Sequence, residues 1–189
     1  CLCFSQPELL MSRPASASSL IDSGISIRPD SPDFDAAIDS LFDQGFGPGR
    51  FAKTAERLRE GNVERYDLSR VALKESEIIA AGKVWPIEIG GVPVLFFGPF
   101  AVDLDERHHG LGRIIIDSCI EAAITAGERA MLLVGAASYF EPSGFEIVPK
   151  DLLTLPGPVD PKRLLWRALR PTGLEGLSGA VTLPRAARP

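Results

Sequence analysis

Apolar and polar positions along the chain follow two periods, one typical of helices and one typical of strands. Apolar residues at helical spacing predict helices from about residue 33 to 42, from 51 to about 61 and from 110 to 127, and a single helical turn at 138–141. Alternation and short apolar runs predict strands at 25–29, 68–73, 78–87, 92–102, 131–135 and 145–149, and a strand or short helix at 163–169. The order β-α-α-β-β-β-α-β-α-β-β predicts one layered α/β domain.

The boundaries of this domain follow from where the periodic pattern begins and fades. Residues 1–23 lack hydrophobic periodicity, and we interpret them as a disordered leader or a misplaced start. The domain is expected to run from 24 to 170. Residues 171–189 are rich in glycine, proline and alanine, and we assign them to a C-terminal tail.

Composition narrows the classes of function that this domain can have. The chain has 189 residues, 45% of them hydrophobic, and a net charge of -5 without any basic run, which argues against a nucleic-acid partner. The apolar stretches fall short of the about 20 residues that cross a bilayer, so no membrane partner is expected. Three cysteines do not build a disulfide framework. We therefore expect a cytoplasmic protein.

The candidate binding residues lie between the apolar strand at 92–102 and the helix that begins near Gly110. Gly98-Pro99 interrupts this strand, which predicts a bulge or splay. The loop Arg107-His108-His109-Gly110-Leu111-Gly112 then opens the helix, and a glycine-rich helix N-terminus with free amides favours a pyrophosphate. Two nucleotide-binding motifs are absent here. The glycine spacing is not the Gly-x-Gly-x-x-Gly of dinucleotide-binding loops, and no Gly-Lys-Ser/Thr of a P-loop follows.

Three further segments accompany this loop: Phe97-Gly98-Pro99-Phe100-Ala101-Val102-Asp103 before it, and Leu132-Leu133-Val134-Gly135 and Tyr139-Phe140-Glu141-Pro142-Ser143-Gly144-Phe145 after it. Together they resemble the GNAT superfamily of N-acetyltransferases, in its YhbS-like bacterial branch. The resemblance extends from about Ile25 to the tail and includes 46–51 and 155–158.

The resemblance implies a GNAT (acyl-CoA N-acyltransferase) fold, an α/β fold with a mixed, mostly antiparallel, splayed sheet flanked by helices. It also implies transfer of the acetyl group from acetyl-CoA to a primary amine of a small molecule or protein. Backbone groups of three strand residues would bind the pantetheine, and the loop and helix start would bind the pyrophosphate. The implied cofactor-binding residues are Phe100, Ala101, Val102, Arg107, His108, His109, Gly110, Leu111, Gly112 and Arg113.

The catalytic acid is where the chain departs from the family's pattern. Family members often have a tyrosine four residues before the glycine of the Gly-Phe pair, and Phe140 occupies that position here. Its neighbour Tyr139 is the candidate general acid, although adjacent side chains on a helix point about 100° apart. The alternative interpretation is a half-buried tyrosine without a catalytic role.

No general base is assigned. Glu88 and Asp103 lie near the expected cleft, but Asp103 is interpreted as capping the loop and Glu88 as solvated near a hairpin turn, and deprotonation through water stays open.

The remaining reactive residue types are interpreted as structural. The imidazoles of His108 and His109 are expected to be inert, and no metal site is expected because the chain has no third histidine. Cys119 is interpreted as a small core residue, and Trp85 and Trp166 as packing residues.

Two functions compete with an N-acetyltransferase that acts as a monomer or homodimer. One is a catalytically weak acyl-CoA-binding sensor or interaction module. The other is an unrelated domain that binds a phosphate ligand.

Overall fold

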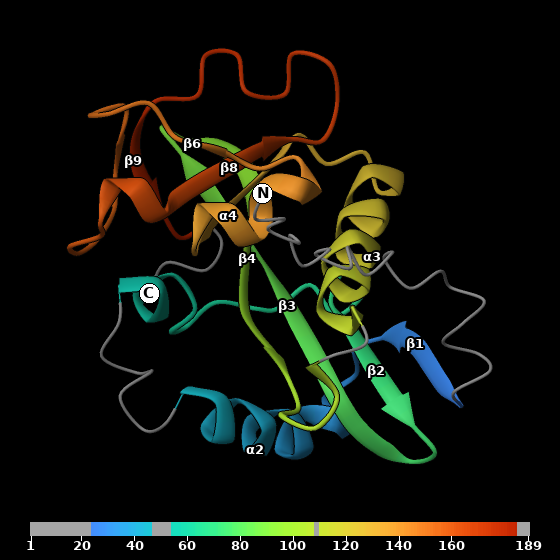
Figure 1. Ribbon diagram of the computed structural model, residues 1–189. Coiled ribbons are helices and arrows are strands. Elements are labelled where there is room, and N and C mark those ends of the chain that lie inside the picture. The colour runs from blue at the N-terminus through green and yellow to red at the C-terminus, as the bar shows by residue number, and fades with distance from the viewer. Residues whose placement is uncertain (1–23, 47–53, 108–109, 185–189) are drawn as a thin grey trace, which may run out of the picture.

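A computed structural model of the chain describes residues 24–46, 54–107 and 110–184, which form an open sheet with helices on its faces (Figure 1). The strands are β1 (Ile25–Pro29), β2 (Arg70–Lys74), β3 (Glu77–Ile89), β4 (Val92–Val102), β5 (Ala130–Val134), β6 (Glu146–Ile147), β7 (Leu153–Thr154), β8 (Leu164–Ala168) and β9 (Gly179–Thr182). The helices are α2 (Asp35–Phe46), α3 (Leu111–Thr125) and α4 (Ala137–Phe140), with 3₁₀ turns η1 (Pro32–Phe34), η3 (Thr54–Leu58), η5 (Glu141–Ser143) and η6 (Pro161–Arg163).

The sheet has the strand order β1-β2-β3-β4-β5-β8-β6, and β9 pairs with both β3 and β7. Neighbouring strands are antiparallel except for β4 with β5 and β7 with β9. The mixed, mostly antiparallel α/β sheet that we expected is therefore confirmed. No helix in the described part of the chain is long and apolar enough to cross a membrane.

The two long helices cover opposite faces of the sheet (Figure 1). Successive residues of β2 show this arrangement. Val71 packs with residues of α2 on one face, and its neighbour Ala72 packs with residues of α3 on the other. The apolar stripe of α3 is fully buried at Ile115, Ile116 and Cys119. This burial is what holds the N-terminus of α3 against the end of β4.

Strand β4 contains the bulge that Gly98-Pro99 predicted. Val84 lies opposite Phe97, and Gly82 lies opposite Phe100, so two residues of β4 oppose the single residue Lys83 of β3. The extra residue shifts the alternation of side chains along β4. Phe97 and Phe100 therefore lie on the same face, with ring centroids 6.0 Å apart.

Strands β4 and β5 separate soon after they pair. Their parallel register covers only residues 95–97 of β4 and 131–133 of β5. β4 then continues to Val102 along β3 alone, while β5 leads into α4. Trp85 supports the point of separation, because its indole Nε1 donates a hydrogen bond to the carbonyl of Gly98 at 2.8 Å.

The segment after Pro171 carries structure that the residue pattern did not indicate. Strand β9 pairs with Glu88 and Ile89 of β3, and the side chains of Leu177 and Val181 are buried in the core. Because these contacts are supplied by distant strands, the weak local pattern of this segment did not predict them.

Candidate functional site

The free edge of β4 offers backbone hydrogen-bonding groups beyond the point where β5 departs. The amide of Asp103 donates to the carbonyl of Ile79 on β3 at 2.8 Å. Backbone groups alternate in direction along a strand, so those of Ala101 also face β3, while those of Phe100 and Val102 face the open edge. Of the three residues expected to contact the pantetheine, Phe100 and Val102 therefore present their polar backbone groups to the split.

Helix α3 begins beside this edge with a left-handed residue. Gly110 is the N-cap with φ of 68°, and the hydrogen bond from the amide of Ile114 to its carbonyl, at 3.3 Å, belongs to the first turn. The amides of Leu111 and Gly112 precede that turn and point out of the helix end, where its dipole is positive. This end of the helix suits an anion.

Gly112 keeps the space above the helix start narrow but open. A Cβ atom at this position would lie 2.3 Å from the Tyr139 hydroxyl oxygen and 3.0 Å from Cζ of Phe100. Only glycine therefore fits between the helix and these two rings without a shift of the tyrosine.

The two arginines that flank the loop have different environments. Arg107 is exposed, and its Nε donates to the carbonyl of Val102 at 3.3 Å. The side chain of Arg113 instead donates to Asp117, at 2.7 Å, and to the carbonyl of Pro142, and its amide donates to Gly110. His108 and His109 lie outside the described residues.

A cleft of about 750 Å³ opens where β4 and β5 separate. Its lining has an uncharged part from β4, β5 and α4 and a charged part from the region of η3 and from residues 158–163. The lining residues are Thr54, Ala55, Arg57, Arg59, Phe96, Phe97, Gly98, Pro99, Phe100, Val134, Gly135, Ala136, Tyr139, Phe140, Pro158, Val159, Asp160 and Arg163.

Tyr139 and Phe140 both line this cleft although they are adjacent in sequence. Their rings stand nearly perpendicular, with centroids 5.1 Å apart, in a helix of only four residues. The Phe140 ring packs edge-on against Phe97 and Phe145, so it belongs to the core as well as to the cleft wall. Tyr139 is half-exposed and contacts Phe100.

Partial burial raises the pKa of the Tyr139 hydroxyl above its ordinary value, and the positive charges of Arg107 and Arg113 oppose this rise. The hydroxyl is therefore protonated at neutral pH. Tyr139 can donate a proton or a hydrogen bond within the uncharged part of the cleft.

Solved structures with the same architecture come from several bacteria. A GNAT family N-acetyltransferase (YhbS) from Escherichia coli, in complex with CoA, is 25% identical with a TM-score of 0.71 over 83% of this chain and 88% of that chain. A GNAT family acetyltransferase from Brucella melitensis, in complex with acetyl-CoA, is 20% identical with a TM-score of 0.64 over 88% and 99% of the two chains. The chain has the GNAT fold. The resemblance to GNAT N-acetyltransferases, including YhbS, is confirmed.

A more distant neighbour, an acetyltransferase from Streptococcus agalactiae, shares 15% identity at a TM-score of 0.56 over 77% of this chain and 98% of that chain, and it shows the fold alone. No protein-family model matches the sequence, and no curated protein matches it.

Neither of the two candidate bases, Glu88 and Asp103, belongs to the cleft at the split. The Oδ1 atom of Asp103 accepts a hydrogen bond from the amide of Asp105 at 2.9 Å, so Asp103 caps the loop as expected. The expectation that Glu88 is solvated is wrong. Glu88 is buried, because β9 covers β3 and pairs Thr182 with it. Neither carboxylate lines the cleft.

Cys119 and the two tryptophans have the structural roles that we expected. Burial raises the pKa of the Cys119 thiol to about 12, so it stays neutral within the core under α3. Trp85 supports the carbonyl of Gly98, and Trp166 packs in the core and donates to Glu146 at 3.2 Å.

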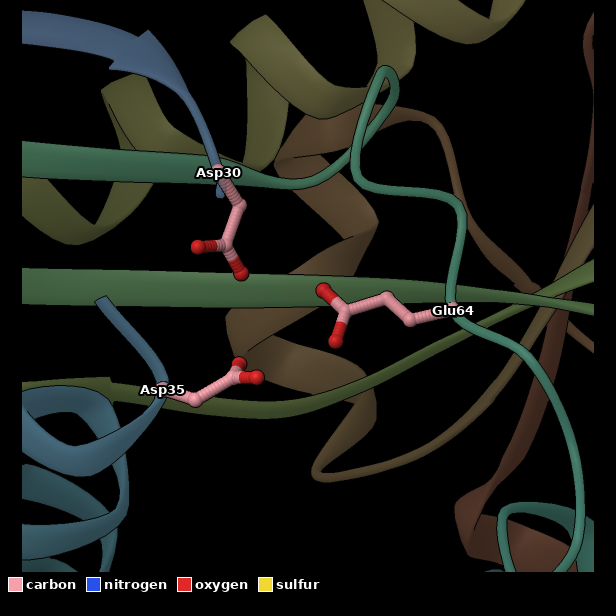
Figure 2. Close-up of side chains that lie close together, drawn as sticks. All are labelled: Asp30, Asp35 and Glu64. Carbon is pink, nitrogen blue, oxygen red and sulfur yellow. The ribbon is translucent and has the colours of Figure 1, made fainter. Parts of the chain in front are cut away.

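A buried charge cluster lies on the α2 face of the sheet, and the sequence pattern did not reveal it. Lys83, opposite the bulge of β4, has its Nζ 2.7 Å from Glu64, 2.9 Å from Asp35 and 3.6 Å from Asp30. Figure 2 shows these three carboxylates converging from the end of β1, the start of α2 and the loop before β2. Tyr66 extends the cluster with a hydrogen bond to Asp35 at 3.0 Å.

The same carboxylates could hold a metal ion by their mutual distances, since one oxygen from each lies within 4.8 Å of the others. The ammonium group of Lys83 is already within ion-pair distance of all three. Lys83 therefore provides the positive charge of this cluster. Its pKa is raised, because the hydrogen bond to Glu64 and the neighbouring carboxylates outweigh the lowering by burial.

Stability should fall with rising pH because of Glu64. Burial raises the pKa of Glu64 from 4.5 to about 7, partly opposed by Lys83. Between these two values the folded chain holds a proton that the unfolded chain has lost, so the free energy of unfolding decreases as pH rises through this window, by roughly 1–3 kcal/mol.

Urea unfolding at pH 5 and pH 8 measures this change. Glu64→Gln should remove most of the difference between the two pH values, since the amide does not titrate. An unchanged pH dependence in Glu64→Gln would show that other groups cause it.

Proposed function

We propose that the chain is an N-acetyltransferase that transfers the acetyl group of acetyl-CoA to a primary amine. The observation that carries the proposal is the continuous path from the start of α3 along the open edge of β4 to the cleft at the split. Its neighbours in fold were crystallised with CoA and with acetyl-CoA, which supports acyl transfer in general.

The proposed binding mode uses the geometry of β4 and α3. The pantetheine would bond to the backbone of Phe100 and Val102, with Ala101 contributing to the strand that supports them. The pyrophosphate would lie on the amides of Leu111 and Gly112, at the positive end of α3. Loop residues Arg107, His108, His109, Gly110 and Arg113 complete the proposed site.

The uncharged part of the cleft would hold the thioester. The amine nitrogen attacks the carbonyl carbon, the carbon–sulfur bond breaks, and the thiolate takes a proton while the amine loses one to water. Among the described residues of this part, Tyr139 is the only ionisable side chain, and it is protonated at neutral pH. Tyr139 is therefore the proposed general acid.

Replacing Tyr139 with phenylalanine tests this role. We expect kcat for thiol release from acetyl-CoA to fall roughly 100-fold or more, because general acid catalysis contributes a factor of this order. The Kd of CoA should stay unchanged, since the phenylalanine ring keeps the contact with Phe100.

Thiol release with a panel of primary amines and calorimetric titration with CoA measure the two quantities. A weaker Kd with unchanged kcat would instead make the Tyr139 hydroxyl a CoA-binding group, because it lies directly above Gly112.

A CoA-binding sensor is the second candidate, and the buried phenyl ring of Phe140 favours it. This ring packs in the aromatic core at a position where GNAT enzymes often have a tyrosine. Tight CoA binding without turnover of any amine would select the sensor over the enzyme.

A further inference from the structure

The charged part of the cleft lies on the other face of the sheet from the start of α3, and the two parts of the cleft meet at the split. Ala55, Leu58 and Val159 pack in the same apolar cluster as Phe96 of β4. Phe97 packs in a different apolar cluster, together with the start of α3. Successive residues of β4 point to opposite faces, so η3 and the 158–163 segment border the split on the face away from α3.

These two segments are bonded to each other although about a hundred residues separate them. Thr54 Oγ1 donates to the carbonyl of Pro158 at 2.7 Å, and the guanidinium of Arg57 donates to the carbonyl of Pro156. Gly157 permits the approach, because a Cβ there would lie 2.7 Å from Thr54 Oγ1. The charged wall is therefore a fixed part of the fold.

Positive charge predominates on this wall. Arg57, Arg59 and Arg163 line the cleft, against one carboxylate from Asp160. Asp160 Oδ1 accepts the amide of Lys162 at 3.0 Å, so this carboxylate caps η6. The local positive charge contrasts with the net charge of the whole chain, which is -5.

The three guanidinium groups differ in how many hydrogen bonds and ion pairs they already form within the protein. Arg59 forms an ion pair with Glu56, and Arg57 donates to a backbone carbonyl. Arg163 makes no side-chain hydrogen bond or ion pair to any described residue. Its backbone is nevertheless fixed beside the split, because its carbonyl accepts the amide of Gly135 at 2.8 Å, directly after β5.

From this arrangement we infer that the acceptor carries an anionic group, a carboxylate or a phosphate, in addition to its amine. The inference rests on the proposed function, which places the thioester in the neighbouring uncharged part of the cleft. The guanidinium fork binds either anion through paired hydrogen bonds. Arg163 and Arg57 hold the anion, and this contact directs the amine toward the split.

The test uses pairs of amines that differ only in charge: glutamate and glutamine, alanine and alaninamide, and phosphoethanolamine and ethanolamine. Binding of each to the CoA-saturated full chain is measured by calorimetry, and thiol release from acetyl-CoA is measured in parallel. We expect at least one anionic member to bind roughly tenfold more tightly than its neutral partner. The pair that responds distinguishes a carboxylate from a phosphate.

Arg163→Gln should remove this preference and leave the Kd of CoA unchanged. Lys162→Gln is the matched control, because Lys162 is the exposed neighbour and does not line the cleft. Equal or weaker binding of all anionic members overturns the inference, and so does a loss of CoA affinity in Arg163→Gln. Preferential binding of an anionic amine without any thiol release supports the inference and refutes the N-acetyltransferase proposal.

Discussion

Gly112→Asp is expected to weaken CoA binding by roughly 100-fold or more. A Cβ at this position meets the Tyr139 hydroxyl at 2.3 Å and Phe100 at 3.0 Å, so the side chain would occupy the space beside the helix start. The added carboxylate would also stand among the amides that are proposed to bind the pyrophosphate, where like charges repel. Calorimetric titration with CoA measures the loss.

Gly112→Asn is the matched variant, since asparagine has nearly the size of aspartate without its charge. The difference in CoA affinity between the two variants gives the electrostatic part of the effect. Thermal unfolding of both verifies that the fold is retained. If Gly112→Asp binds CoA as the unchanged chain does, the N-terminus of α3 does not bind the anion.

Lys83→Met is expected to lower the free energy of unfolding by about 3–5 kcal/mol. Removing the ammonium group leaves the carboxylates of Asp30, Asp35 and Glu64 close together without their cation, and the side chains of Asp30 and Glu64 are almost fully buried. Urea unfolding at pH 7 measures the change.

Lys74→Met is the control for Lys83→Met. Its Nζ lies 2.6 Å from Glu106, but the lysine is exposed, and water screens an exposed ion pair so that it contributes little to stability. Adding Asp30→Asn to Lys83→Met should recover part of the stability, because one buried carboxylate is replaced by a neutral amide. Equal stability of Lys83→Met and the unchanged chain would mean that the cluster contributes nothing to folding.

Local patterns predicted the elements that build the CoA path. Strand 92–102 was predicted with the bounds of β4, and the interruption at Gly98-Pro99 is a bulge beside a splay. The predicted helix at 110–127 corresponds to α3. These features are encoded by neighbouring residues, through strand alternation, helical spacing and glycines, and so the sequence alone reveals them.

Features that depend on distant pairing could not be predicted in this way. Lys83 meets its three carboxylates only through the register of β3 and the docking of α2. Arg57 and Arg163 are about a hundred residues apart and share a cleft through the backbone carbonyls of 156–158. A charged residue on its own in the sequence resembles one on any solvated surface, so the sequence does not distinguish either group from exposed charges.

Titration of the unaltered full chain with CoA in a calorimeter measures whether β4 and α3 bind the cofactor. Saturable binding at a single site is expected, because the open edge of β4 and the start of α3 together form one path for the cofactor. Absence of saturable binding at millimolar CoA would show that this path does not bind CoA, and the GNAT fold would then have to serve another ligand.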